Sequence, residues 1–154
     1  MNILFIDDDD IRTAPLREGL PSMGDYSVTH IRNPIESIEI FGTDPKQFQL
    51  IVVDIMMPHY AAPEYRDFSI PKYFQDNNDG IYTGLKVLMQ LEAIMIQWSI
   101  SIPIIVLTHI PDVNKYITEL VASGALLKRP SAVLIKPVFI KDFVDVIERL
   151  GQHD

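Results

Sequence analysis

Five polar side chains directly follow short apolar runs of the sequence, and their types suit the chemistry of metal ions and phosphate groups. In chain order they are Asp7, Asp8, Asp54, Thr108 and Lys136. Singly, each has an ordinary explanation, because acids and hydroxyls cap helices and a lysine at a strand end is usually solvated. Together they offer three carboxylates, one hydroxyl and one ammonium group, a set that is complementary to a cation and a phosphoryl group.

The three carboxylates predict a site for a hard divalent cation. Carboxylates at close range repel one another and raise at least one pKa unless a cation joins them. An oxygen-only set suits Mg²⁺ above all, with Mn²⁺ as a substitute, and it disfavours zinc. Lys136 and Thr108 would then face phosphoryl oxygens, so that either an aspartate accepts a phosphoryl group covalently or the site only binds phosphate. Asp54 is the best nucleophile because it follows the most apolar run, residues 50–53.

The composition excludes several classes of protein. A length of 154 residues fits one domain of ordinary size, so we expect no output domain beside it. The formal net charge of −8 argues against direct binding to nucleic acid, whose phosphates would repel this chain. The absence of cysteine excludes disulfides, zinc–thiolate sites and thiol catalysis, and it suits a reducing compartment, so we expect a cytoplasmic protein.

Neither a signal peptide nor a membrane-spanning segment is expected. The first apolar run ends in four aspartates, residues 7–10, which is the opposite of a basic signal peptide. The apolar stretch 87–107 contains Gln90, Glu92 and Pro103, so it predicts a buried helix followed by a buried strand rather than a membrane span.

The elements that must position the five side chains follow from the hydrophobic pattern. Short apolar, β-branched runs predict strands at residues 3–6, 26–31, 50–53, 104–107 and 133–135. Most of these runs are continuous apolar blocks, which is typical of strands that are covered on both faces. Helical patterns lie between them, beginning near residue 13 and covering residues 34–41, 84–96, 112–123 and 139–150. This alternation predicts an α/β fold with a parallel sheet and helices on both faces. Ligands of such a sheet bind outside the carboxyl ends of its strands, where all five side chains would meet.

Local signals mark the ends of several of these helices. Asn33 is a plausible N-cap, followed by Pro34 at the first helical position and Glu36 at the third. Gly124 and Gly151 are stop signals after the last two helical patterns. The first helix is the weakest prediction, because prolines and a glycine interrupt it.

The segment 59–82 fits none of these elements. It contains four of the six tyrosines, together with prolines and a polar turn. A loop of this length is uncommon inside a compact domain and is often functional, and its aromatic content argues against plain disorder. Three interpretations are open: a loop packed on the neighbouring helix, a lid, or a surface for a partner protein.

The polar side chains lie in motifs that resemble the receiver domain of two-component response regulators. The motifs, in order over nearly the whole chain, are residues 3–9, 50–58, 83–88, 103–108 and 135–137. The resemblance implies a flavodoxin-like (βα)5 fold with strand order 2-1-3-4-5. It also implies a stand-alone receiver over residues 1–154, with an insertion at 59–82 directly after the phosphoacceptor strand.

The resemblance further implies a function. Asp54 would accept a phosphoryl group from a phosphohistidine on a sensor histidine kinase or a histidine phosphotransfer protein. Phosphorylation and dephosphorylation would be self-catalysed, so the chain would not be a turnover enzyme, and its output would be contact with an unknown downstream protein. The implied Mg²⁺ ligands are Asp8, Asp54 and the backbone carbonyl of Met56, with Asp7 acting through water. Lys136 and Thr108 would contact the phosphoryl oxygens, and Lys136–Pro137 would be a cis peptide.

Three positions depart from what the family usually carries. Val133 stands where receivers have an aromatic switch residue, which puts the usual coupling to the threonine in doubt. His109 stands where the family prefers a small side chain, so that it narrows access to Asp54, acts as a titratable gate, or simply points to solvent. Met56 and Ile110 occupy positions that tune attack by water, and because both are apolar we expect slow autodephosphorylation. Asp10 lies beyond the matched acid pair and is expected to be a cap or a solvated charge.

Other classes of protein are open alternatives. The main one is a phosphate-independent interaction module that has the same fold and works through residues 59–82. An aspartyl hydrolase of the haloacid-dehalogenase type would need a second aspartate two residues after Asp54, where Met56 stands instead. A flavodoxin-like FMN binder would need a phosphate loop after the first strand, where residues 7–10 would repel phosphate.

Overall fold

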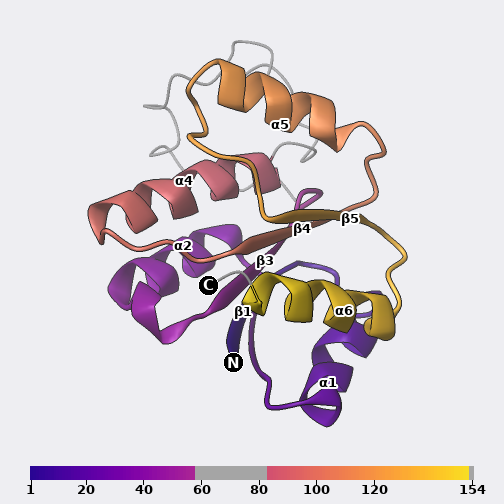
Figure 1. Ribbon diagram of the computed structural model, residues 1–154. Helices are drawn as coiled ribbons and strands as arrows, with labels where there is room; N and C mark the ends of the chain where they lie inside the picture. The colour runs from indigo at the N-terminus through magenta and orange to yellow at the C-terminus, as the bar shows by residue number, and fades with distance from the viewer. Residues whose placement is uncertain (58–82, 153–154) are drawn as a thin grey trace.

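The computed structural model describes residues 1–57 and 83–152, and it has a five-stranded parallel sheet with helices on both faces (Figure 1). The strand order is β2-β1-β3-β4-β5, as predicted. The strands are β1 (Asn2–Ile6), β2 (Ser27–Ile31), β3 (Leu50–Asp54), β4 (Ile104–Thr108) and β5 (Ala132–Ile135). The described helices are α1 (Ala14–Met23), α2 (Pro34–Thr43), a short 3₁₀ turn η1 (Pro45–Gln47), α4 (Thr83–Gln97), α5 (Val113–Ala122) and α6 (Ile140–Gly151). The segment 59–82, on which the lid and partner-surface interpretations rest, lies outside the described residues.

Two apolar cores separate the sheet from its two helical layers. Helices α2, α4 and α5 cover one face, and α1 and α6 cover the other (Figure 1). Side chains of β1 alternate between the cores, with Leu4 and Ile6 in the first and Ile3 and Phe5 in the second. Both sets are fully buried, which explains why the central strands appear in the sequence as continuous apolar runs.

The helix ends agree with several of the local signals. The side chain of Asn33 caps α2 by accepting hydrogen bonds from the backbone N–H of Ile35 at 2.9 Å and of Glu36 at 3.4 Å. Gly124 follows α5 with a φ of 76°, a left-handed conformation that glycine adopts without strain. Helix α1 begins one residue after its N-cap Thr13, as expected, and it accommodates a proline in its first turn.

The apolar stretch 87–107 forms most of α4 and then β4, as predicted. Met95 and Leu91 of α4 are buried in the first core, and β4 is buried along its whole length. Within residues 1–57 and 83–152, no helix is long and apolar enough to cross a membrane.

The parallel register brings the carboxyl ends of the strands to one edge of the sheet. Ile6 pairs with Val53, which in turn pairs with Val106 of β4. Thr108, the last residue of β4, pairs with Ile135, the last residue of β5. The residues that end or follow β1, β3, β4 and β5 therefore lie together, which is the placement that the sequence predicts for the five polar side chains.

Candidate functional site

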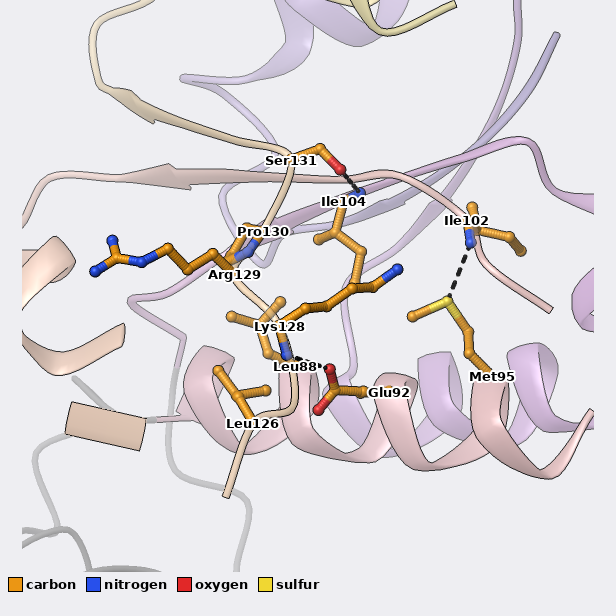
Figure 2. A pocket seen from close by; sticks show the side chains of 10 residues that line it. All are labelled: Leu88, Glu92, Met95, Ile102, Ile104, Leu126, Lys128, Arg129, Pro130 and Ser131. Carbon is orange, nitrogen blue, oxygen red and sulfur yellow. Dashed lines mark hydrogen bonds between the residues drawn. The ribbon is translucent and has the colours of Figure 1, made fainter. Parts of the chain in front are cut away.

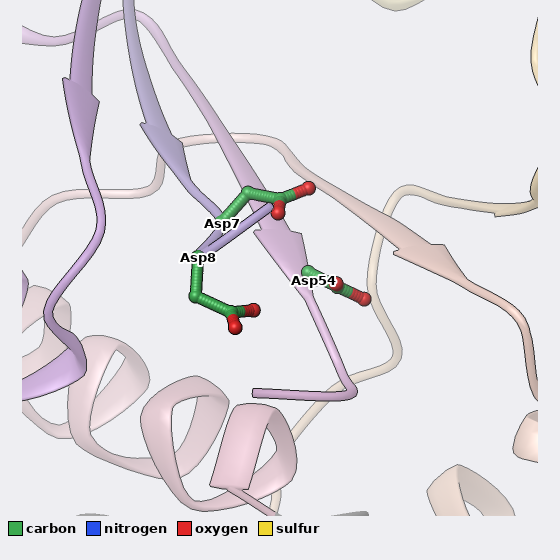
Figure 3. Close-up of side chains that lie close together, drawn as sticks. All are labelled: Asp7, Asp8 and Asp54. Carbon is green, nitrogen blue, oxygen red and sulfur yellow. The ribbon is translucent and has the colours of Figure 1, made fainter. Parts of the chain in front are cut away.

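Three carboxylates converge at this edge of the sheet. Asp7 and Asp8 follow β1, and Asp54 is the last residue of β3 (Figure 3). Each offers a carboxylate oxygen, and these three atoms lie within 4.8 Å of one another. Asp7 is fully buried, Asp54 is 3% exposed, and Asp8 is half-buried. The donor set consists of oxygen atoms alone, so it fits the Mg²⁺ or Mn²⁺ ion that the sequence predicts.

Among the described residues, Lys136 is the one positively charged side chain that contacts these carboxylates. Its Nζ donates hydrogen bonds to Asp54 Oδ2 at 2.8 Å and to Asp7 Oδ2 at 3.1 Å. Lys136 follows β5, where its backbone N–H donates to the carbonyl of Thr108 at 2.8 Å, and the Lys136–Pro137 peptide is cis, as predicted. Burial alone would lower the pKa of Lys136, but the charges of Asp54 and Asp7 outweigh burial and raise that pKa above its ordinary value.

The carboxylates are short of positive charge even with this lysine. Burial raises the pKa of Asp54 to about 6, and the charge of Asp7 adds to the rise, although the charge and hydrogen bond of Lys136 oppose it. Burial and the charge of Asp7 also raise the pKa of Asp8. A divalent cation would remove this imbalance, so the electrostatics of the cluster support the same ligand as its geometry.

Gly84 allows helix α4 to pack directly against the end of strand β3. Its backbone N–H donates to the carbonyl of Ile55 at 3.0 Å. A Cβ atom at this position would clash with the backbone oxygen of Asp54 and with Cα of Ile55. The rigid backbone leaves no room for adjustment, so glycine is required for the close approach that fixes the end of β3.

An open cavity of about 650 Å³ lies above the carboxylates. Its lining residues are Asp8, Asp9, Asp10, Ile11, Arg12, Arg32, Asp54, Met56, His109 and Lys136. Met56 is 41% exposed, and its backbone N–H donates to Asp54 Oδ1 at 3.2 Å. His109 is exposed and lies at the mouth of the cavity, where burial, Lys136 and Arg12 lower its pKa. The exposed side chain agrees with the solvent-facing interpretation of His109, and control of access to Asp54 stays a prediction.

Two arginines of this cavity were not singled out in the sequence. Arg32 follows β2, and its NH1 lies 2.8 Å from Asp10 Oδ2. Arg12 lies 3.5 Å from Asp9 Oδ2. Applying the strand-end rule to β2 would have identified Arg32. Asp10 is indeed a partly solvated charge, but the expectation that it acts as a cap is wrong, because Thr13 is the N-cap of α1.

The remaining predicted positions lie around this cluster. Thr108 is fully buried, and its Oγ1 accepts a hydrogen bond from the backbone N–H of Ile110 at 3.0 Å. Val133 is half-buried and packs against the first core, so the side chain at the usual aromatic position is apolar and held inward. Neither Met56 nor Ile110 offers a polar side-chain group at the cavity.

A second cavity, between α4 and the segment before β5, has a structural role (Figure 2). Its volume is about 20 Å³, room for about one water molecule. The buried carboxylate of Glu92 accepts hydrogen bonds from the backbone N–H of Leu127 at 2.7 Å and of Lys128 at 3.0 Å. Because these bonds satisfy the carboxylate, Glu92 anchors the segment that leads into β5.

The fold is shared with receiver domains of response regulators. A response regulator receiver domain protein from Clostridium thermocellum is 19% identical, with a TM-score of 0.63 over 98% of this chain and 97% of that chain. A two-component response regulator from Clostridium difficile is 17% identical, with a TM-score of 0.67 over 99% and 97%. The chemotaxis protein CheY4 of Vibrio cholerae is 21% identical, with a TM-score of 0.62 over 96% of each chain. The sequence matches no protein-family model and no curated protein. At these identities the likeness establishes the receiver fold.

Proposed function

We propose that this chain is a response regulator receiver that accepts a phosphoryl group on Asp54 from a phosphohistidine donor. The observation that carries the proposal is the convergence of Asp7, Asp8, Asp54 and Lys136 at the carboxyl edge of a receiver-type sheet. The partner is a sensor histidine kinase or a histidine phosphotransfer protein, and the output is contact with a downstream protein. In this proposal the chain is a single receiver domain that acts in the cytoplasm and is not a turnover enzyme.

The transfer forms one bond and breaks one bond. A carboxylate oxygen of Asp54 attacks phosphorus, the bond between phosphorus and the imidazole nitrogen of the donor breaks, and the nitrogen leaves with the electron pair. Asp54 must be ionised to attack, and a pKa of about 6 leaves it mostly ionised at neutral pH. Its Oδ1 accepts the Met56 N–H and its Oδ2 accepts from Lys136, so hydrogen bonds orient both oxygens before the reaction.

Mg²⁺, when bound by Asp8, Asp54 and the Met56 carbonyl, with Asp7 acting through water, supplies charge that balances the phosphoryl oxygens. The ammonium of Lys136 supplies a further positive charge from the β5 side. Thr108 ends the adjacent strand, and its hydroxyl proton is available to a phosphoryl oxygen because the Ile110 contact uses the oxygen only as an acceptor.

The aspartyl-phosphate should be long-lived. Water that attacks it must be oriented by a polar side chain, whereas Met56 and Ile110 are apolar. Hydrolysis then depends on solvent that enters the cavity past His109 unassisted.

Intact-mass measurement tests the proposal. The protein is treated with a small phosphoryl donor and Mg²⁺, beside Asp54→Asn and the matched variant Asp145→Asn, which changes an exposed carboxylate of α6. We expect a mass gain of one phosphoryl group in the wild type and Asp145→Asn but not in Asp54→Asn. If no protein gains this mass when Mg²⁺ is present and no chelator is added, the result would contradict the proposal. It would favour the alternative of a phosphate-independent interaction module.

A further inference from the structure

His30 of β2 lies directly behind the main chain of the acidic run that follows β1. Its Nε2 lies 2.8 Å from the backbone oxygen of Asp7, and its Nδ1 lies 3.0 Å from NH1 of Arg17. A carbonyl can only accept and a guanidinium can only donate, so both contacts are satisfied by a single form of the ring, the neutral tautomer with its proton on Nε2. The ring also meets Phe5 edge-on, with centroids 6.3 Å apart, so packing fixes its plane.

Arg17 of α1, which contacts His30, also contacts a later residue of the acidic run, residues 7–10. Its NH2 donates to the backbone oxygen of Asp10 at 2.8 Å, and its Nε lies 3.4 Å from Thr13 Oγ1. The Thr13 hydroxyl donates to the backbone oxygen of Asp9 at 2.8 Å. The Arg17 side chain is 12% exposed, so its charge acts from a largely buried position.

The backbone carbonyls of Asp7, Asp9 and Asp10 are therefore each held by a side chain, from β2, from the N-cap of α1 and from α1 respectively. Four adjacent carboxylates repel one another, and an unsupported loop would let them separate into solvent. Here the main chain at Asp7 is fixed on the β2 side, while the backbone N–H of Asp9 donates to Asp7 Oδ1 at 2.6 Å. With backbone and carboxylate both held, Asp7 Oδ2 lies 3.1 Å from Lys136 Nζ, inside the cluster.

We propose that His30 and Arg17 are positioning residues of the acidic cluster and that they set its affinity for a divalent cation. They touch neither the cation nor a phosphoryl group. They hold the main chain at Asp7 and Asp10, and they also lie near Asp10 Oδ1, at 3.8 Å for Arg17 NH2 and 3.7 Å for His30 Nδ1. The inference deepens the proposed function and rests on it as far as the cation is concerned. Outer partners of this kind typically change metal affinity by about 10- to 100-fold when they are removed.

Two pairs of variants separate positioning from packing and from charge. His30→Phe keeps an aromatic ring against Phe5 and loses both hydrogen bonds, whereas His30→Gln retains a donor and an acceptor at similar reach. Arg17→Met removes charge and hydrogen bonds, whereas Arg17→Lys keeps the charge and loses the fork of donors. Arg12→Met removes one exposed positive charge from the same loop, so it measures how much the loss of charge alone changes the affinity for the cation.

Calorimetric titration of each metal-free protein with Mg²⁺ gives the dissociation constant, and urea unfolding in EDTA gives the stability. We expect the dissociation constant to rise about tenfold or more in His30→Phe, Arg17→Met and Arg17→Lys, and to recover in His30→Gln to within about threefold. Arg12→Met should have a clearly smaller effect than either Arg17 variant. Variants that lose stability but keep the wild-type dissociation constant would overturn the proposal.

A spectroscopic readout in the metal-free protein distinguishes failure of this inference from failure of the proposed function. The amide signal of Asp9 reports its short hydrogen bond to Asp7 Oδ1, and long-range nitrogen–proton spectra report the His30 tautomer. We expect the neutral Nε2–H form, with an Asp9 signal that moves in His30→Phe and returns in His30→Gln. If the wild type binds no Mg²⁺, the proposed function fails, and these signals still decide the positioning role. An unmoved Asp9 signal or the other tautomer would refute it.

Discussion

Asp54 should destabilise the metal-free protein at neutral pH, although it forms an ion pair. Its carboxylate is 3% exposed, and burial raises its pKa from an ordinary value of 3.8 to about 6 despite the hydrogen bond from Lys136. A rise of this size corresponds to about 3 kcal/mol of differential stability between the protonated and ionised forms. Asparagine is a neutral side chain of nearly the same shape, so Asp54→Asn should raise the free energy of unfolding at pH 7.5 by up to about 3 kcal/mol.

The pH dependence has a definite sign. Because the pKa of Asp54 is higher in the folded than in the unfolded chain, the folded state binds this proton more tightly. The penalty is absent below pH 3.8, develops as pH rises from there to about 6, and is constant above. The stability advantage of Asp54→Asn over the wild type should therefore grow as pH rises from 3.8 to about 6 and stay constant at higher pH.

Urea unfolding followed by circular dichroism, in EDTA at several pH values, measures the effect. Asp145→Asn is the matched control, because it removes an exposed carboxylate and should change stability by no more than about 0.5 kcal/mol. Adding Mg²⁺ should reverse the order, since the cation stabilises only the intact cluster. If Asp54→Asn is the less stable protein in EDTA at pH 7.5, the ion pair with Lys136 outweighs burial and the reasoning is refuted.

The remaining predictions concern the cation, the acyl phosphate and two structural contacts. Mg²⁺ at one hundred times its dissociation constant should stabilise the wild type by about 2.7 kcal/mol, and a thermal melt of Asp8→Ala should show a smaller gain. Met56→Asn or Ile110→Glu should shorten the phosphoryl lifetime in a radiolabel chase, and an unchanged lifetime would show that these positions do not limit attack by water. Gly84→Ala should cost about 1–3 kcal/mol in urea unfolding, because the added methyl group meets the backbone at Asp54. Glu92→Gln should cost a similar amount, about 1–3 kcal/mol, and raise amide exchange at the two bonds it anchors; unchanged exchange would contradict the anchoring role.

The parallel sheet could be predicted because the relevant signals are local and repeated. Four of the five strands consist mainly of consecutive apolar residues, and one rule about strand ends is enough to bring Asp54, Thr108 and Lys136 together from distant parts of the chain. The same rule reaches Arg32, which follows β2, but an arginine after an edge strand carries no signal that distinguishes it from a solvated side chain.

The support behind the acidic run could not be predicted in the same way. His30 occupies a half-buried position of β2 between the exposed Thr29 and the buried Ile31, and this pattern identifies only a side chain that faces the protein. Its partner Arg17 lies in a helix whose path is set by tertiary hydrogen bonds to the loop after β1, and these depend on contacts that no spacing in the sequence encodes. The segment 59–82 remains a sequence-based prediction, since it lies outside the described residues.

The charges of the four aspartates divide into two groups with different consequences. Asp9 pairs with the exposed Arg12 of the loop and Asp10 with the exposed Arg32 that follows β2, and Asp9 also accepts the N–H of Ile11, so their charges are balanced within the protein. Among the described residues, Lys136 forms ion pairs with Asp7 and Asp54, and the three clustered carboxylates of Asp7, Asp8 and Asp54 therefore exceed this one ammonium by two negative charges. One divalent cation neutralises that excess. A monovalent cation would leave the cluster negative, and the remaining negative charge would oppose the approach of a phosphoryl donor. The charge count therefore favours a divalent ion as the ligand that the proposed phosphoryl transfer requires.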